Sequence, residues 1–283
     1  MKSEICKVTA ATITVIIGTQ LGGPDPASAA GSLDLAPHRA LYEISLAGTR
    51  NGSEITGLQG RMVLEWADAC DGWTVNQKVR MDLSHLSGLP MRNEFSFSSY
   101  ESKDGNALRF SMRSMADGRQ YEEFVGAATR ESGGGSVDFD TPENLALDLP
   151  DGVSFPSEHL FILVERVLAG DRVVSMVVFS GTGPDSLHDV TAFVGAEIPA
   201  GSRPIKTAPE FDSASPFGDL AAMRSWPVAM AYFPHGQNEL EPEFEVSYRL
   251  MENGVAGNLL LDYGEFSMRA VLEKFEFLER PDC

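Results

Sequence analysis

Basic residues are scarce in this chain of 283 residues. It has 22 Lys and Arg against 41 Asp and Glu, which gives a formal net charge of −19. Binding to nucleic acid or docking on anionic lipid requires a concentrated basic surface. The charge balance therefore excludes nucleic acid as a partner and disfavours electrostatic docking on membranes. The remaining composition, with 43% hydrophobic residues, is that of a globular protein.

The sequence also lacks an apolar run long enough to cross a bilayer. The uncharged stretch Val8–Leu21 has fourteen residues, whereas a spanning helix needs about 20. A lysine-bearing start precedes it, and the small residues Ala27, Ser28, Ala29 and Ala30 follow. This pattern is typical of a secretory signal peptide. We therefore predict that residues 1–30 are a signal, cleaved after Ala29 or Ala30, and that residues 31–283 form a single exported domain.

Cysteine is limited to three residues, and Cys6 belongs to the predicted signal. Cys70 and Cys283 remain, and neither lies in a CxxC motif. Two cysteines alone do not form a structural zinc site, and two thiols in an oxidising compartment usually pair. We expect a Cys70–Cys283 disulfide, with two unrelated free thiols as the alternative.

Motifs for catalysis, metal binding and cofactors are missing. The sequence has no GxSxG elbow, Walker loop or Rossmann fingerprint. Ser157 and His159 diverge by about 200° on a helix, which is poor geometry for a nucleophile and its base. We therefore expect His159 to be a hydrogen-bonded structural residue. The five histidines have no metal-ligand spacing, and the alternating acidic residues suggest a solvated, repulsive strand edge rather than a calcium site: His38, His85, His159, His188 and His235; Glu239, Glu241, Glu243 and Glu245.

Alternation of apolar and polar residues dominates the rest of the chain. Between Trp73 and Leu83 the apolar residues share one parity, which indicates strands with one buried face. Turn dipeptides recur at short intervals and favour hairpins: Asn51-Gly52, Asp71-Gly72, Asp104-Gly105, Asp117-Gly118 and Asn253-Gly254. We predict a mostly β fold of twelve to fourteen antiparallel strands, in a spiral or broken barrel. The parity changes before Phe275, which predicts a bulge near Glu273–Lys274.

One segment has helical periodicity. The apolar stripe of Leu160–Leu168 predicts a helix that Ser157 caps and Gly170 ends. Because the stripe is wide, we place this helix inside the curve of the sheet. The segment Gly201–Asp219 has no pattern and is predicted to be a surface loop.

A curved sheet around one helix often leaves a gap. We expect such a gap to take an acyl chain, and the expected lining is Trp73, Phe110, Phe155, His159 and Leu163. The alternative is a fully packed core whose outer surface recruits a protein partner. Trp66 and Trp73 flank Cys70, and we interpret them as core packing rather than a ligand-stacking surface.

Several segments, in order, resemble the EipB-like family of periplasmic envelope-integrity proteins. They are Leu35–Tyr42, Cys70–Trp73, Phe155–His159, Phe179–Gly181 and the terminal Cys283. The resemblance implies a periplasmic β-spiral in Gram-negative bacteria that resembles lipoprotein carriers, with an early cysteine paired to a very late one. It also implies a non-enzymatic role, without cofactor or metal, in binding a protein partner (repeat proteins included), a lipid or a lipoprotein. The alternative is an envelope hydrolase whose active site is not visible in sequence.

Overall fold

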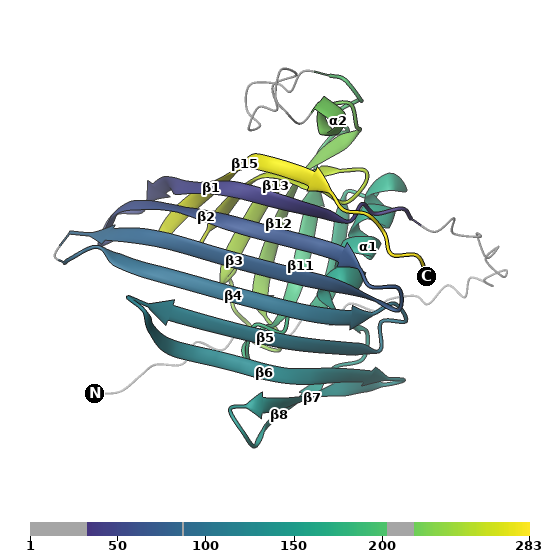
Figure 1. Cartoon of the computed structure of the whole chain (residues 1–283), viewed down its shortest axis with the longest axis horizontal. Helices are drawn as coiled ribbons and strands as arrows, with labels where there is room; N and C mark the ends of the chain where they lie inside the picture. Colours follow the sequence, from purple (N-terminus) through teal and green to yellow (C-terminus); the bar gives the residue numbers. More distant parts are fainter. Residues whose placement is uncertain (1–32, 87, 203–217) are drawn as a thin grey trace, which may run out of the picture. The chain divides into compact units, whose positions relative to one another are not determined.

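Figure 1 shows the computed structural model, which describes residues 33–86, 88–202 and 218–283. The predicted signal peptide and most of the predicted loop at 201–219 lie outside the described residues. Residues Leu33–Cys283 form one compact unit. Its elements are β1 (His38–Thr49), β2 (Ile55–Asp68), β3 (Gly72–His85), β4 (Met91–Ser102), β5 (Ala107–Ala116), β6 (Arg119–Glu131), β7 (Gly134–Thr141), β8 (Leu145–Leu149), β9 (Val153–Ser154), α1 (Pro156–Leu168), β10 (Val173–Phe179), β11 (Leu187–Val194), α2 (Gly218–Ala221), β12 (Ser225–Pro234), β13 (Phe244–Met251), β14 (Ala256–Asp262) and β15 (Phe266–Phe277).

The described strands form one sheet in the order β8-β7-β6-β5-β4-β3-β2-β1-β15-β14-β13-β12-β11-β10-β9 (Figure 1). Neighbouring strands are antiparallel except β9 and β10, which are parallel. The predicted mostly β, antiparallel fold is confirmed. The described part has fifteen strands rather than twelve to fourteen. Part of the difference is β9, which has two residues and is too short to alternate.

The predicted alternation places one face of each strand in the interior. In β3 the apolar parity ends at Leu83, which is buried opposite Leu58 of β2. The predicted bulge is confirmed in β15. There Leu41 of β1 faces Lys274 while the next residue, Tyr42, faces Leu272, so Glu273 is the extra residue.

The turn dipeptides also behave largely as expected. Glycines with positive φ occupy four of the five predicted turns, at Gly52, Gly105, Gly118 and Gly254. The fifth turn differs, because the left-handed residue before β3 is Cys70, with φ of 67°, and not Gly72.

Helix α1 spans Pro156–Leu168 and ends before Gly170, whose φ of 95° fits the predicted stop. The predicted Ser157 cap is wrong. The N-cap residue is Phe155, and it makes no side-chain capping bond. Ser157 lies two residues after the N-cap, where its Oγ accepts a hydrogen bond from Trp66 Nε1 at 3.3 Å. A carboxylate from the sheet caps the helix instead, as described below. Neither helix of the described residues has the length and apolar composition needed to cross a bilayer.

The sheet curves around α1, as predicted. Leu163, Val164 and Val167 of the helix pack in one cluster with residues from β2 and from β10–β13. Strands far apart in the sheet order thus contact the same helix. A second cluster fills the space under β1, β2 and β15, and a third lies under β4–β8.

Candidate functional site

Strands β5 and β10, from opposite halves of the sheet order, meet through aromatic side chains instead of a hydrogen-bonded ladder. Phe110 of β5 packs edge-on against Phe179 at the end of β10, with ring centroids 5.8 Å apart. Gly181, which follows, has φ of 74°, and a Cβ there would lie 3.0 Å from the Phe110 ring. Glycine is therefore favoured where the chain passes this ring, both by the positive φ and by the close approach. We call this junction the seam.

A cavity of about 250 Å³ lies at the seam. One wall comes from β6 and the other from β11, β12 and the residues around the start of β13, while the β10–β11 connection lies between them. The lining residues are Glu122, Phe124, Val178, Ser180, Thr182, Gly183, Pro184, Asp185, Ser186, His188, Tyr232, Glu243 and Phe244. We call this the seam cavity.

A histidine–carboxylate pair forms part of its wall. His188 Nε2 lies 2.9 Å from Glu243 Oε2, and the His188 side chain is 9% exposed. Its ring packs edge-on against Tyr232 and Phe244, which stack on each other with centroids 4.3 Å apart. Burial raises the pKa of Tyr232 well above its ordinary value, so its hydroxyl stays neutral.

The charge of the cavity wall is negative. Glu122, Asp185 and Glu243 contribute carboxylates, and no Lys or Arg is among its described lining residues. The Glu122 and Asp185 side chains make no hydrogen bond or ion pair with any described residue. Such a wall suits a group with an apolar body and a positive end, because carboxylates and aromatic rings both attract cations.

The hydroxyls of the cavity are bonded to groups other than the histidine. Ser186 Oγ donates to the Gly183 carbonyl at 2.7 Å, and the Ser180 and Thr182 hydroxyls bond each other at 2.9 Å. Within the described chain, none of these hydroxyls is hydrogen-bonded to His188. The geometry therefore contains an acid and a base without an aligned nucleophile.

The alternating acidic residues do not form the predicted strand edge. Glu239, Glu241 and Glu243 precede β13, and Glu245 lies inside it. Strand β13 is also internal, between β12 and β14. The alternation therefore marks the β12–β13 connection, and one of its members, Glu243, reaches the seam cavity. Among the described residues no group of three or more His, Cys, Asp or Glu side chains is placed to hold a metal ion.

The residues predicted to line a groove beside the helix do not lie together. Phe110 and Phe155 belong to the cluster under β4–β8, while Leu163 and Trp73 belong to the cluster around α1. Phe155 is fully buried and Leu163 is 1% exposed. Neither of the two cavities described here is lined by any of the five. His159 is buried, but its Nε2 has no hydrogen-bond partner among the described atoms, contrary to the prediction. Burial lowers its pKa to about 4, so it is neutral.

A buried carboxylate that the sequence analysis missed caps α1. Glu101 of β4 is 2% exposed, and its two oxygens accept the backbone N–H groups of Ser157 at 2.6 Å and Glu158 at 2.7 Å. Burial raises its pKa to about 7, against the lowering effect of these hydrogen bonds. Glu158 in turn pairs with Arg130 at 2.6 Å. The signal was available, because Glu101 shares the inward parity of Phe97 in β4.

The second cavity, of about 1140 Å³, lies at one end of strands β1–β4. Its charged residues are mostly engaged with each other. Arg92 Nε donates to Asp82 Oδ1 at 2.8 Å, and the Arg92 backbone N–H donates to Asp117 Oδ1 at 2.9 Å. We therefore favour the seam cavity as the candidate site.

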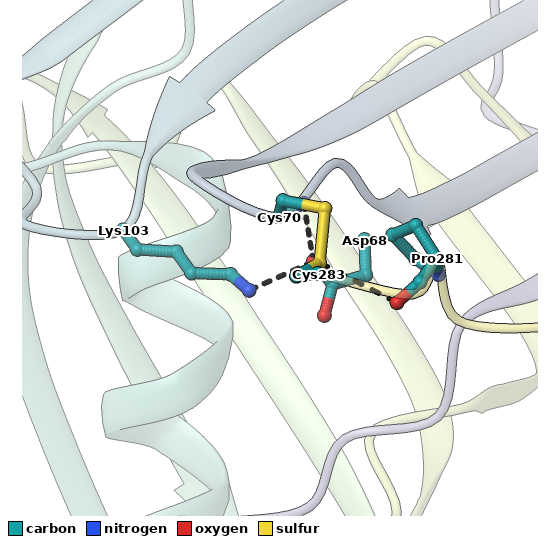
Figure 2. The surroundings of a disulfide bond; sticks show 5 residues. All are labelled: Asp68, Cys70, Lys103, Pro281 and Cys283. Carbon is teal, nitrogen blue, oxygen red and sulfur yellow. Dashed lines mark hydrogen bonds and ion pairs between the residues drawn. A yellow bond between two sulfur atoms is a disulfide. The ribbon is translucent and has the colours of Figure 1, made fainter.

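Cys70 and Cys283 form a disulfide (Figure 2), with Cα atoms 5.8 Å apart. Cys70 lies between β2 and β3, where its N–H donates to Asp68 Oδ1 at 2.9 Å. Lys103 also donates to Asp68, at 2.7 Å. Figure 2 shows the Lys103 side chain extending toward the bridge from one side, with Asp68 and Pro281 on the other. The bond fastens the chain end after β15 to the β2–β3 connection.

The tryptophans that flank Cys70 pack as core residues, as expected. Trp66 and Trp73 stack with centroids 4.4 Å apart, and both rings contact Phe161 of α1.

Comparison with known proteins gives a consistent result. A family model described as EipB-like matches residues 29–279. The cell envelope integrity protein EipB of Brucella abortus (strain 2308) is 30% identical over 278 residues, which cover 96% of this chain and 95% of that protein. A crystal structure described as a beta-barrel-like protein of domain of unknown function DUF1849, from Brucella abortus, has 28% sequence identity and a TM-score of 0.78. The match covers 88% of this chain and 100% of that one.

Proposed function

This chain belongs to the EipB-like family, and from that premise we propose that it supports cell-envelope integrity in the periplasm by binding a partner, without catalysing a reaction. The name of the Brucella relative supports the envelope role. A disulfide is favoured in an oxidising compartment, which supports an extracytoplasmic location.

The observation that carries the binding proposal is the seam cavity. It combines stacked aromatic rings, a half-buried histidine–carboxylate pair and two further carboxylates without partners among the described residues. Groups of this kind, converging in a concave site, are typical of ligand recognition. Because no cavity hydroxyl of the described chain is bonded to His188, binding is a better match for this geometry than hydrolysis.

The size and charge of the cavity indicate its ligand. Pockets that enclose drug-sized ligands measure about 300–1,000 Å³, and the seam cavity is smaller, at about 250 Å³. It therefore suits one side chain better than a whole acyl chain. Its carboxylates favour a lysine or arginine on a protein partner, and we propose a protein partner ahead of a lipid or lipoprotein.

The proposal is tested in a strain that lacks the gene. Complementation with the double variant Glu122→Gln, Asp185→Asn removes two negative charges from the cavity at almost unchanged volume. We expect this variant to fail under detergent stress, while Glu165→Gln, at an exposed position on α1, restores growth. Full rescue by the cavity variant would contradict the proposed site.

A second measurement separates binding from hydrolysis. A photo-crosslinking amino acid at Thr182, in the cavity wall, should join one defined periplasmic protein, and the same residue at Arg109, on the exposed face of β5, should not. The cavity double variant should lose this crosslink. If His188→Gln abolished rescue while the cavity variant kept both rescue and crosslink, the hydrolase alternative would be favoured.

A further inference from the structure

Two consecutive residues of β11 hold the β12–β13 connection, residues 235–243. His188 pairs with Glu243 at the end of this connection, and Asp189 Oδ1 lies 2.9 Å from Nδ1 of His235 at its beginning. Successive side chains of a strand point to opposite faces of the sheet. The connection is thus fastened at both ends, by one histidine–carboxylate pair on each face.

Few other contacts hold the connection. Backbone hydrogen bonds anchor its two ends, from His235 N–H to the Leu187 carbonyl at 3.0 Å and from Glu243 N–H to the Tyr232 carbonyl at 2.8 Å. Between them the chain is exposed, and Leu240 is 97% exposed. The two pairs are therefore a large share of the interactions that hold the connection against β11.

We propose that these two pairs form a pH-sensitive clasp, which tightens the β12–β13 connection against the seam cavity as both histidines become protonated. The inference rests on the proposed function in one respect only, which is that the clasp would regulate binding in the seam cavity. The clasp itself is a property of the chain without a ligand.

The direction follows from the charges around each histidine. Around His188 lie Glu243, the neutral Tyr232 and, in the same cavity wall, Glu122 and Asp185. His235 faces Asp189. Histidine is the side chain whose ordinary change of charge lies between pH 5 and 8, where ordinary carboxyl groups are already ionised. Protonation of each histidine therefore converts a hydrogen bond between a neutral ring and a carboxylate into an ion pair between opposite charges, which strengthens the attraction within the pair.

The clasp also changes the charge that a ligand meets. With His188 protonated, its positive charge offsets one of the three cavity carboxylates. With His188 neutral, the described wall carries three carboxylates and no cation. A cationic side chain should therefore bind more weakly at acidic pH, when the connection is held more tightly.

Hydrogen–deuterium exchange of the ligand-free chain tests the clasp. After correction for intrinsic exchange rates, we expect the hydrogen-bonded amides of His235 and Glu243 to exchange about fivefold more slowly at pH 5.5 than at pH 7.5, as two partly exposed pairs would give. The double variant His188→Gln, His235→Gln should lose this dependence. His85→Gln is the matched control and should keep it, because His85 has no ion pair within the described chain.

A single surface variant provides a second test in case the double variant misfolds. Asp189 is 51% exposed, so Asp189→Asn removes one pair without disturbing the interior and should roughly halve the dependence. Equal exchange at both pH values in the unmodified chain, or an unchanged dependence in Asp189→Asn, would overturn the clasp. Neither result bears on the complementation and crosslinking experiments, so failure of the clasp is distinguishable from failure of the binding site.

Discussion

Breaking the disulfide should destabilise the protein mainly through the unfolded state. Residues 278–283 follow the last strand and are mostly exposed, so the folded chain loses few contacts when Cys70→Ser releases them. The unfolded chain, in contrast, loses a cross-link between residues 213 positions apart. The bridge thus closes most of the domain into one loop.

The size of the effect follows from loop-closure entropy. For a loop of this length the entropy term corresponds to about 5 kcal/mol at 25 °C. This is an upper figure, because denatured chains retain structure that already restricts them. We expect Cys70→Ser to lower the free energy of unfolding by roughly 2–5 kcal/mol and the melting temperature by about 5–15 °C, with the fold retained.

Denaturant and thermal melts of residues 31–283 measure this change. Cys70→Ser, Cys283→Ser and the double variant should be equally destabilised, since each removes the same bond. The urea m-value should rise because the unfolded chain exposes more surface without the cross-link. Asp68→Asn is the control for the hydrogen bonds beside the bridge and should have a much smaller effect. A melting temperature within 1 °C of the parent in all three cysteine variants, or two reactive thiols per chain in the oxidised parent, would refute the reasoning.

Three further predictions concern stability. Glu101 has a folded pKa of about 7, above its unfolded value, so its contribution to stability is greatest below about pH 4.5 and is lost as pH rises to 7. In urea melts between pH 5 and 8, the free energy of unfolding of Glu101→Gln should therefore depend less on pH than that of the parent. The variant should also lose about 1–3 kcal/mol because its cap on α1 is weaker. Phe155→Ala should cost about 3–5 kcal/mol in the same melts, because the side chain is fully buried, whereas Tyr121→Ala at an exposed site should cost little. Gly181→Ala should cost about 1–3 kcal/mol, because φ is positive there and the new Cβ would press on Phe110; no loss would contradict the seam packing.

Much of the fold follows from local pattern. The inward row of β3, the helix and its glycine stop, and the bulge at Glu273 are all set by residues close together in the sequence. Period-two alternation specifies which face of a strand is buried, and a change of parity reveals an extra residue. The parity of β4 marks Glu101 as an inward-facing carboxylate, but local pattern does not connect it with the helix. Glu101 lies 56 positions before Ser157, and only the tertiary fold brings the two together.

The candidate site depends on contacts of a different kind. Its lining comes from separate segments around residues 122–124, 178–188, 232 and 243–244, and no spacing in the sequence connects them. They meet only because the sheet curves far enough for β6 to approach β11–β13. The residues predicted to line a groove beside the helix are also separated by strand order. Phe110 and Phe155 belong to one cluster, and Trp73 and Leu163 belong to another.

The seam is the part of the described sheet where strands approach each other without backbone pairing, and the candidate binding site lies there. Elsewhere in the sheet, adjacent described strands are paired through hydrogen-bonded ladders, which bulges interrupt at single positions. At the seam, side chains such as Phe110 and Phe179 make the closure. Packed side chains can leave a gap between two strands, whereas backbone pairing holds neighbouring strands close together. Polar groups can line such a gap without disrupting the hydrogen bonds of a strand pair. The carboxylates of Glu122 and Asp185, which have no partner among the described residues, lie in this gap. Charge there is therefore added with little effect on the strand pairing that stabilises the sheet.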